Sequence, residues 1–384
     1  MSSNNGSYSN MPFGTPRRRS KRTFLGALFV IVLLALTISL SIALVIAYLT
    51  PYVSPSTFGS LTIVGIFAPV LFIMVASCML LWLVTGRWKI ALVVAIFLIP
   101  GVFRLSDFYN IDFTREVESR PGSRSFTVMS YNVRGFFDDE GQRTIDRFVD
   151  YLSENDLADV LCFQEFPSES AGIARIDSLV TERYGEHFYI SDAIEAGNVV
   201  LRTYSRFPIL AEGAIAGQGR GTSQWVDVKI NDSDTLRIFN NHLYTMSISV
   251  EDSEDIARGK ILQDGDRMRS IVDRIADNSS IRANHVDTLS MVINETPYER
   301  IVCGDFNDTP MSYVYSELSN NLLDAFVEAG SGYGYTFRPM YGMLRIDYLL
   351  HSEGLESISY FANEDLELSD HLPIVVRLRR VTEM

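Results

Sequence analysis

The hydrophobic positions of this chain follow two different patterns, which change near residue 105. Before this point the apolar residues form long runs without charge, at positions 23–50, 58–85 and 90–103. About 20 apolar residues are enough to cross the hydrocarbon core of a bilayer. The pattern therefore predicts a transmembrane region at 23–104 with two or three helices, at about 23–50, 58–85 and 89–104.

Basic residues set the expected orientation of these helices. Segment 17–22 and loop 86–89 contain Lys and Arg, whereas loop 51–57 has no charge. Lys and Arg concentrate on the cytoplasmic side of a membrane, so residues 1–22 are expected to be a disordered basic arm in the cytoplasm. With three crossings the protein is multi-pass in the plasma or inner membrane, and everything after Arg104 is extracytoplasmic. If the third and shortest run does not cross, the rest of the chain is cytoplasmic.

From about residue 120 to 384 the pattern changes to short runs rich in Val, Ile and Phe, separated by turn residues and amphipathic stretches. Short buried runs predict strands, and an apolar stripe with a period near 3.6 predicts helices. Helices are expected at 142–155, 173–184 and about 254–281. Strands are expected at 126–132, 159–165, 187–191, 198–204, 224–230, 236–242, 300–303, 345–351, 357–361 and 374–378. Such a mixture is typical of one α/β domain with helices packed outside one or two mixed sheets.

Charge limits what this domain binds. Residues 1–104 contain eight of the 33 Lys and Arg residues and no Asp or Glu, so residues 105–384 carry 25 basic and 47 acidic residues, a net charge of −22. A domain with this charge repels polyanions at long range, which argues against tight nonspecific binding to nucleic acid. A phosphate substrate is compatible with it if a bound metal ion offsets the charge. The three cysteines lie in apolar runs, which predicts buried free thiols instead of disulfides.

Polar side chains capable of chemistry recur where the expected strands end. Asp305 and Asn307 directly follow the apolar run 300–303, and side chains two residues apart point the same way. The other such side chains are Asn132, Glu165, His242, Asp347, Asp370 and His371. Each of them alone also fits a turn cap, a solvated strand end or a structural histidine. Together they supply the groups that metal-assisted phosphoryl transfer needs.

The strand-end segments occur in an order that resembles the endonuclease/exonuclease/phosphatase superfamily. This family includes deoxyribonuclease I, abasic-site endonucleases, inositol polyphosphate 5-phosphatases and neutral sphingomyelinases. The matching segments are Asn132, Gln164-Glu165, Asn240-Asn241-His242, Gly304-Asp305-Phe306-Asn307, Arg345-Ile346-Asp347-Tyr348 and Ser369-Asp370-His371-Leu372-Pro373. The resemblance covers about residues 124–380 and implies a catalytic domain at 120–384. The implied fold is α/β with four layers, a sandwich of two packed mixed β-sheets flanked by helices, as in deoxyribonuclease I.

The resemblance also implies hydrolysis of a phosphoester by in-line attack of water, with Mg²⁺ or Mn²⁺ as cofactor. Glu165 is expected to be a direct metal ligand, with Asn132 beside it and Asp370 in support, because hard cations prefer oxygen ligands. His242 is expected to donate a hydrogen bond to a phosphoryl oxygen or to the leaving group. Family members give this histidine an acidic partner, for which Glu195 is the nearest and a weak candidate.

The remaining expected catalytic residues come from the last three motifs. Asp347 and His371 are expected to form a dyad in which the carboxylate fixes the imidazole tautomer. His371 then acts as general base, or it stabilises charge on phosphorus. Asp305 is the rival candidate for positioning the attacking water, with Asn307 holding the water or the phosphate.

The substrate stays open at this point. The favoured prediction is a membrane-anchored, metal-dependent phosphoesterase, with the lipid bilayer and a phosphoester as its partners and no protein partner implied. The phosphoester is a nucleic acid, a phospholipid head group or a small phosphate ester. The alternatives are a sphingomyelinase-like lipid phosphodiesterase and a catalytically inactive, membrane-bound binding module of the same fold. Transport is disfavoured because the apolar runs contain no charge inside the membrane.

Overall fold

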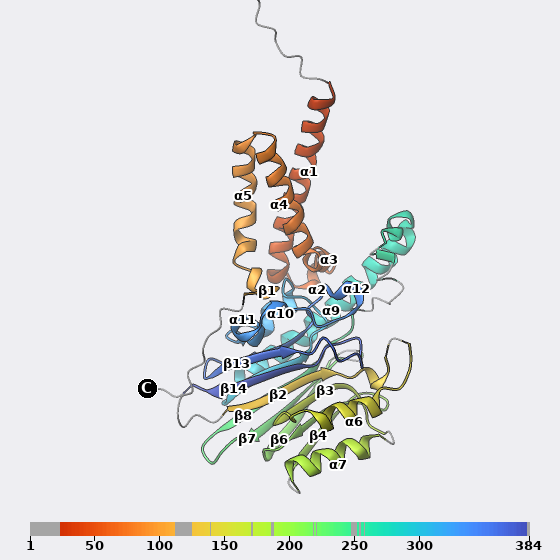
Figure 1. Cartoon of the computed structure of the whole chain (residues 1–384), viewed down its shortest axis with the longest axis vertical. Coiled ribbons are helices and arrows are strands. Elements are labelled where there is room, and N and C mark those ends of the chain that lie inside the picture. Colours follow the sequence, from red (N-terminus) through yellow and green to blue (C-terminus); the bar gives the residue numbers. More distant parts are fainter. Residues whose placement is uncertain are drawn as a thin grey trace, which may run out of the picture.

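Two six-stranded β-sheets form the centre of the structure (Figure 1). The structure is a computed structural model that describes residues 24–111, 125–138, 140–169, 172–185, 188–217, 219, 221–246, 252, 255–256 and 258–381. The first sheet has the order β10 (Leu323–Asp324), β12 (Asp347–His351), β9 (Glu299–Asp305), β8 (Thr235–His242), β7 (Thr222–Lys229), β6 (Ile209–Ala216). The second has the order β13 (Leu355–Ala362), β14 (Ile374–Arg380), β2 (Ser125–Asn132), β3 (Val160–Pro167), β5 (Val199–Ser205), β4 (Tyr189–Ala196). The expected arm at 1–22 lies outside the described residues.

The two sheets pack face to face through apolar side chains from both. Val128 and Val160 of the second sheet share one buried cluster with Ile238, Ile301 and Leu349 of the first. All five are fully buried, and burial of such a side chain stabilises the fold by about 1.5–3 kcal/mol. The apolar runs that predicted strands are therefore the inner faces of a sandwich.

Helices cover the outer face of each sheet. On α6 (Ile145–Glu154), the buried residues Ile145, Phe148, Val149 and Leu152 recur at helical spacing and pack with α7 (Ile173–Tyr184) against the second sheet. On the first sheet, α9 (Gly265–Glu295) and α10 (Tyr313–Leu318) take the same place. The predicted four-layer α/β sandwich of two mixed sheets flanked by helices is confirmed.

Two crossover connections decide where the ends of the strands meet. Helix α6 joins β2 to β3, which pair in parallel, and α9 joins β8 to β9, which also pair in parallel. Parallel neighbours end at the same edge of a sheet. The carboxyl ends of these four strands, which carry the polar motifs, therefore lie along one side of the sandwich.

Some boundaries differ from the expected ones. The helix expected at about 254–281 is α9, which begins later because the Asp264 side chain accepts a hydrogen bond from the Arg267 backbone N–H at 3.0 Å and caps its first turn. It ends later because Leu289 and Ile293 continue its buried face. Strand β6 was not predicted. The short elements are η1 (Thr50–Tyr52), α2 (Pro55–Phe58), α3 (Leu61–Ile66), η2 (Leu105–Asp107), β1 (Tyr109–Asn110), η3 (Arg134–Phe136), η4 (Lys260–Gln263), α11 (Ala325–Ala329), β11 (Gly332–Tyr333) and α12 (Pro339–Gly342).

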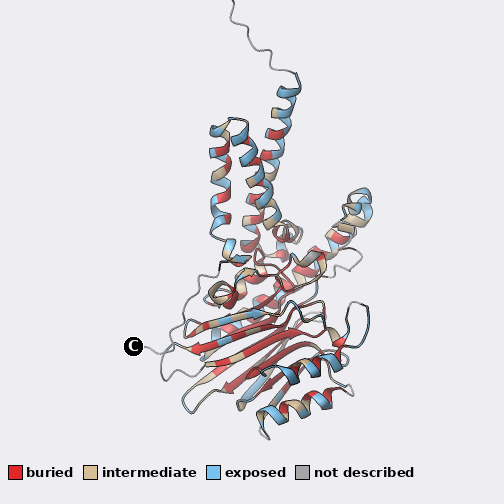
Figure 2. Ribbon diagram, viewed as in Figure 1, coloured by how far each residue is buried: buried red, intermediate tan, exposed pale blue. Residues whose placement is uncertain are grey.

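The N-terminal part is a bundle of α1 (Phe24–Leu49), α4 (Ala68–Val84) and α5 (Trp88–Val102) that stands on the sandwich (Figure 1). Of the described helices, one is long and apolar enough to cross a membrane, at Phe24–Tyr52, while α4 and α5 are apolar but shorter. We expected two or three helices of membrane length, and among the described residues one helix has that length. Exposed residues cover the outside of the bundle (Figure 2).

The helix expected at 58–85 is broken into two helices, α3 and α4. Helices α2 and α3 precede α4, in which Pro69 lies in the first turn, where a proline without an N–H group fits best. Gly65 lies against the sandwich so closely that a Cβ atom would be 2.6 Å from the Met311 carbonyl oxygen. Contact with the sandwich, which composition does not reveal, therefore interrupts the apolar run.

Hydrogen bonds tie the N-terminal part to the loop that follows β9. Thr50 Oγ1 donates to the Met311 carbonyl oxygen at 2.6 Å, and Arg104 Nη2 donates to the Pro310 carbonyl oxygen at 2.9 Å. Ile66 of α3 packs in a buried cluster with Met246 and Ile346 of the sandwich. The bundle is therefore attached within a few residues of Asn307.

Candidate active site

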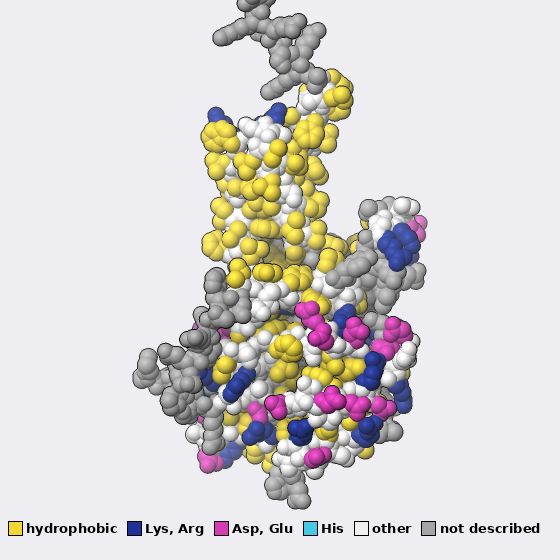
Figure 3. Space-filling model, viewed as in Figure 1, with side chains coloured by type: hydrophobic (Ala, Val, Ile, Leu, Met, Phe, Trp, Pro, Cys, Tyr) yellow, Lys and Arg dark blue, Asp and Glu magenta, His cyan; other side chains and the backbone are white. Residues whose placement is uncertain are grey.

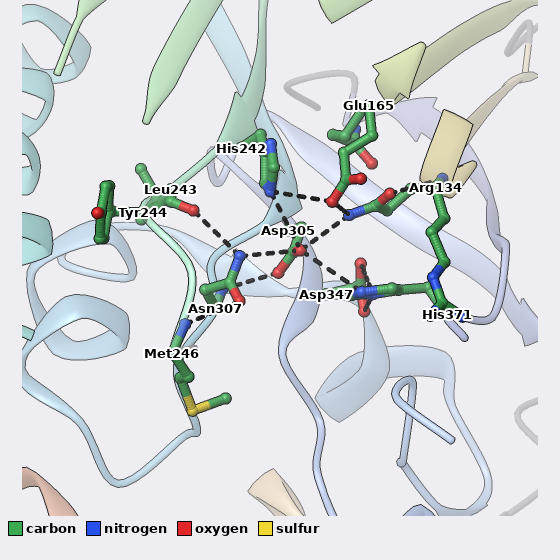
Figure 4. Close-up of polar contacts among 12 residues, drawn as sticks. Arg134, Glu165, His242, Leu243, Tyr244, Met246, Asp305, Asn307, Asp347 and His371 are labelled. Carbon is green, nitrogen blue, oxygen red and sulfur yellow. Dashed lines mark hydrogen bonds and ion pairs between the residues drawn. The ribbon is translucent and has the colours of Figure 1, made fainter. Parts of the chain in front are cut away.

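Three polar residues of the first sheet are brought together by strand register. In the parallel pair β8–β9, His242 lies opposite Asp305, and in the antiparallel pair β12–β9, Asp347 lies opposite Asp305. Asn132, at the end of β2 in the second sheet, donates from Nδ2 to Asp305 Oδ2 at 3.1 Å. Asp305 is therefore the centre of the cluster, and the two sheets meet there (Figure 4).

Asp305 is held from several sides at once. Its Oδ1 accepts a hydrogen bond from the Asn307 backbone N–H at 2.8 Å, and its Oδ2 accepts one from Asn307 Nδ2 at 3.0 Å. Gly304 directly before it has a φ of 127°, and a Cβ atom there would lie 2.0 Å from the Asn241 carbonyl oxygen, so only glycine fits. Burial raises the pKa of Asp305 to about 6, although His371 lowers it.

His371 and Asp347 form a buried dyad. His371 Nδ1 lies 3.0 Å from Asp347 Oδ2, and His371 Nε2 lies 3.7 Å from Asp305 Oδ2. Thr336 Oγ1 accepts the Asp347 backbone N–H at 3.0 Å, and the Phe337 ring packs against the imidazole at 4.9 Å. Burial lowers the pKa of His371, but the Asp347 and Asp305 carboxylates outweigh it and hold this pKa well above its usual range.

A second dyad faces the first across Asp305. His242 Nδ1 lies 2.7 Å from Glu195 Oε2, and His242 Nε2 lies 3.8 Å from Asp305 Oδ2. Burial lowers the pKa of His242, but Glu195 and then Glu165 and Asp305 raise it to about 10. The acidic partner of His242, for which the sequence offered only a weak candidate, is therefore Glu195.

Glu165 reaches the site because its strand is irregular. The pairing of β3 with β5 shifts register between Phe163 and Phe166, and Glu165 has a φ of 50°. Its backbone N–H donates to Glu195 Oε1 at 3.1 Å, which fixes this bulge. The Glu165 side chain then points at the cluster, with Oε1 accepting from Asn132 Nδ2 at 3.2 Å.

Asp370 lies at the edge of the cluster. Its Oδ1 is 4.0 Å from His371 Nε2, and its Oδ2 is 3.5 Å from Arg134 Nε. The neighbouring Ser369 donates to the Asn132 carbonyl oxygen at 2.8 Å and so ties this segment to the end of β2. Arg134 was missed in the sequence because it lies in a short turn, η3, without a chemical motif.

A hydrogen bond between two buried amide side chains was not predicted either. Gln164 Nε2 donates to Asn240 Oδ1 at 2.7 Å, and Asn240 Nδ2 donates to the Phe163 carbonyl oxygen at 3.2 Å. These bonds join β3 of one sheet to β8 of the other directly beneath the site. Both residues lie in the motifs that resemble the family, but only the packing of the sheets shows that their side chains join the two sheets.

The ligands on offer suit a hard divalent cation. Five carboxylates face two imidazoles and one guanidinium, and carboxylate oxygens are what Mg²⁺ prefers. These carboxylates are Glu165, Glu195, Asp305, Asp347 and Asp370. The Glu165 side chain is 38% exposed, more than the other four carboxylates, so it is the most accessible of them to a cation from solvent. Asp305, Asp347 and His371 also offer three ligand atoms within 4.8 Å of one another, but His371 Nδ1 is already engaged by Asp347.

All eight predicted site residues therefore lie in or beside one cluster. The side chains of Glu165 and Asn132 are in contact, and Asp370 contacts Arg134 and His371.

Similarity to known proteins follows the same division of the chain. Residues 129–371 match the Endonuclease/Exonuclease/phosphatase family, and residues 27–108 match a Domain of unknown function (DUF8431). No curated protein matches this chain.

Similar solved structures include three from different organisms. An endonuclease/exonuclease/phosphatase family protein from Bacteroides thetaiotaomicron is 16% identical, with a TM-score of 0.49 over 68% of this chain and 99% of that one. One from Beutenbergia cavernae is 17% identical, with a TM-score of 0.46 over 67% and 72%. The human Nocturnin catalytic domain with bound sulfate anion is 16% identical, with a TM-score of 0.47 over 67% and 95%.

The family match covers more than half of the chain and includes every residue of the cluster described above. The chain therefore belongs to the Endonuclease/Exonuclease/phosphatase family, whose members are hydrolases that act on phosphoester bonds.

Proposed function

We propose that this chain is a membrane-anchored phosphoester hydrolase that depends on Mg²⁺ or Mn²⁺. One observation supports the proposal above the others. The Nε2 atoms of His371 and His242 lie 3.7 and 3.8 Å from the same oxygen of Asp305, and each imidazole has a carboxylate behind it. Two oriented donors and one acceptor around a common point are what hydrolysis of a phosphoester requires.

In this reaction the oxygen of water bonds to phosphorus while the ester P–O bond breaks. Asp305 accepts the proton of the attacking water, because at neutral pH a carboxyl group with a pKa of about 6 is mostly ionised. Asn307 holds Asp305 in place through two hydrogen bonds. The water then lies between Asp305 and the phosphorus atom.

The two histidines act as donors. The pKa of His242 is raised to about 10, so this ring carries a proton at neutral pH, and the Asp347 and Asp305 carboxylates likewise raise the pKa of His371 and favour its protonated form. His371 stabilises charge on the phosphoryl oxygens, which we favour over the role of general base, and His242 donates to a phosphoryl oxygen or to the leaving group. Asp347 and Glu195 keep the two rings oriented. Such preorganised donors contribute without reorganisation during the reaction.

Glu165 and Asn132 are the residues proposed to hold the metal ion, with Asp370 in support. A divalent ion polarises a phosphate oxygen and offsets the charge of the leaving group. Asp370 has a second task in this proposal, which is to position Arg134 beside the site at 3.5 Å.

Glu165→Gln is expected to raise the Mg²⁺ concentration that gives half the maximal rate by at least about tenfold, because outer ligands alone are worth 10–100-fold and a direct ligand is no weaker. The measurement is hydrolysis of bis(p-nitrophenyl) phosphate by the full chain over a Mg²⁺ titration. Glu182→Gln on the exposed face of α7 is the matched control and should leave the titration unchanged. Identical Mg²⁺ dependence of the two variants would contradict the proposed metal ligand.

The membrane anchor is proposed to be α1 with α4 and α5 packed beside it. Hydrophobic side chains cover the bundle, while charged ones gather on the sandwich (Figure 3). Ile73 of α4 and Leu92 of α5 are among many large apolar residues exposed on it, which a soluble bundle rarely shows. The turn between α4 and α5 lies at the end of the bundle away from the sandwich (Figure 1), and Arg87 and Lys89 flank the start of α5 directly after this turn.

From the rule that basic loops stay in the cytoplasm, we propose that the sandwich lies on the extracytoplasmic side. A protease added to intact cells or spheroplasts is therefore expected to cut the sandwich. Cleavage only after lysis would place the sandwich in the cytoplasm.

A further inference from the structure

A cavity of about 640 Å³ lies where the bundle meets the sandwich. Its bundle side is formed by residues such as Ile66, Val70 and Ile73, and its sandwich side by residues such as Met340 and Leu344. The volume falls in the range of small-molecule sites, which is about 300–1,000 Å³. A second hollow of about 250 Å³ shares Pro69, Ile73 and Tyr333 with the first and extends it towards α1 and the end of α5.

One segment contacts both this cavity and the active site. Leu344 lines the cavity, and its carbonyl oxygen accepts the Phe337 backbone N–H at 3.2 Å. Phe337 in turn packs its ring 4.9 Å from that of His371. The backbone N–H of Arg338, another lining residue, donates to the Asp370 carbonyl oxygen at 2.8 Å. Segment 336–344 thus contacts both the cavity and the proposed catalytic groups.

The cavity wall is apolar with one positive charge, which suits the hydrocarbon chain of a molecule that also carries an anionic group. Most of its lining is aliphatic or aromatic, and Arg338 is the one cationic side chain among the lining residues. Arg338 Nη2 donates only to backbone carbonyl oxygens, those of Glu364 at 2.9 Å and Leu366 at 3.0 Å. Its Nε is buried without a hydrogen-bond partner among the described residues. An arginine bonded to carbonyls keeps its full positive charge, and the lining includes no carboxylate that would neutralise it.

The cavity also opens where the proposed membrane would be. Ile73, which lines both hollows, is 64% exposed on the outer surface of α4. Hydrophobic side chains cover the visible face of the bundle as far as the sandwich (Figure 3). A molecule dissolved in the bilayer would reach the cavity without crossing water.

We propose that the substrate is a lipid phosphoester whose hydrocarbon chain occupies this cavity while its phosphate reaches the cluster around Asp305. The inference rests on the proposed function and names the substrate class of the same site. It explains why the sandwich is attached to the bundle beside segment 336–344. It also fits the net charge of −22 in residues 105–384, which disfavours a polyanionic substrate.

The test compares alkyl p-nitrophenyl phosphates with an ethyl or a dodecyl chain, both hydrolysed by the full chain in nanodiscs. The wild type is expected to show kcat/KM for the dodecyl ester at least about tenfold above that for the ethyl ester, since burial of each CH₂ contributes about 0.8 kcal/mol and tenfold is about 1.4 kcal/mol. Ile73→Trp, which puts a bulkier side chain into the wall that both hollows share, should reduce this preference and leave hydrolysis of the ethyl ester unchanged.

Ile96→Trp is the matched control, because Ile96 lies on α5 outside both hollows and is 60% exposed. It should keep the wild-type preference, which separates the cavity from general partition into the nanodisc. An equal preference in Ile73→Trp and the wild type, or no preference in the wild type, would overturn the inference.

Binding of dodecyl phosphate, measured by calorimetry, separates the inference from the proposed function. If neither ester is hydrolysed, the proposed function fails, and binding of dodecyl phosphate then tests the cavity on its own. Dodecyl phosphate that binds the wild type and Ile96→Trp, but binds Ile73→Trp at least about tenfold more weakly, supports the cavity. Equal binding to all three proteins rejects it.

Discussion

Replacement of His371 by alanine is expected to lower kcat for bis(p-nitrophenyl) phosphate by about 10²- to 10³-fold, the usual effect of removing one preorganised donor that stabilises charge in the transition state. The imidazole lies 3.7 Å from Asp305 Oδ2, and the structure describes no second donor in its place between Asp305 and Asp347. KM should change much less, because the proposed role of His371 is to stabilise charge that develops in the transition state.

A matched control separates this effect from loss of the fold. His351 is also a buried histidine on the first sheet, and its Nε2 lies 2.9 Å from Glu328 Oε2, but it is at the opposite end of β12. His351→Gln should lower the melting temperature without lowering kcat per folded molecule. If the two variants lose activity in proportion to their loss of folded protein, His371 has only a structural role.

Removal of the bundle is expected to lower both the solubility of the protein and its kcat. A chain that begins at residue 110 would expose the buried cluster that α3 covers, which includes Met246, Ile271 and Ile346. Exposed apolar patches of this kind cause association. It would also lose the two hydrogen bonds from Thr50 and Arg104 to the loop after Asn307.

We therefore expect the shortened chain to form oligomers or aggregates, and any monomer to have kcat reduced by at least about tenfold, equal to about 1.4 kcal/mol of barrier. The measurements are light scattering and hydrolysis of bis(p-nitrophenyl) phosphate, each compared with the full chain in nanodiscs. A soluble, monomeric domain with the kcat of the full chain would show that the bundle is only a tether.

The fold and the polar residues at the strand ends could be predicted because they follow from the local pattern of apolar and polar positions. Asp305 and Asn307 come directly after an apolar run, and a buried strand that ends in two polar residues places both at a sheet edge. His242 and Asn132 follow the same rule on β8 and β2. Because parallel strands joined by a helix end on one side, the four had to come together once the sheets packed.

The hydrogen-bond and ion-pair partners of these residues were harder to predict. Glu195 lies 47 positions before His242 on a strand of the other sheet, and only the bulge at Glu165 brings the three together. Arg134 takes its position from a turn with left-handed backbone, with φ of 47°. Contacts that depend on packing between sheets leave no periodic trace in the sequence.

The membrane region shows the same limit. Composition alone treats 58–85 as one apolar run, but the contacts of Gly65 with Met311 and the first-turn position of Pro69 divide it. These contacts belong to the junction with the sandwich, which hydropathy does not describe.

The central claim is that the cluster around Asp305 hydrolyses a phosphoester with a bound divalent ion. Its most direct test measures Mg²⁺ binding by calorimetry and turnover of DNA, RNA, sphingomyelin, inositol phosphates and bis(p-nitrophenyl) phosphate with the same purified full chain. We predict Mg²⁺-dependent turnover of at least one of these esters, lost on addition of EDTA and absent in Asp305→Asn. Mg²⁺ binding without turnover of any of them would contradict the claim and identify the chain as a binding module.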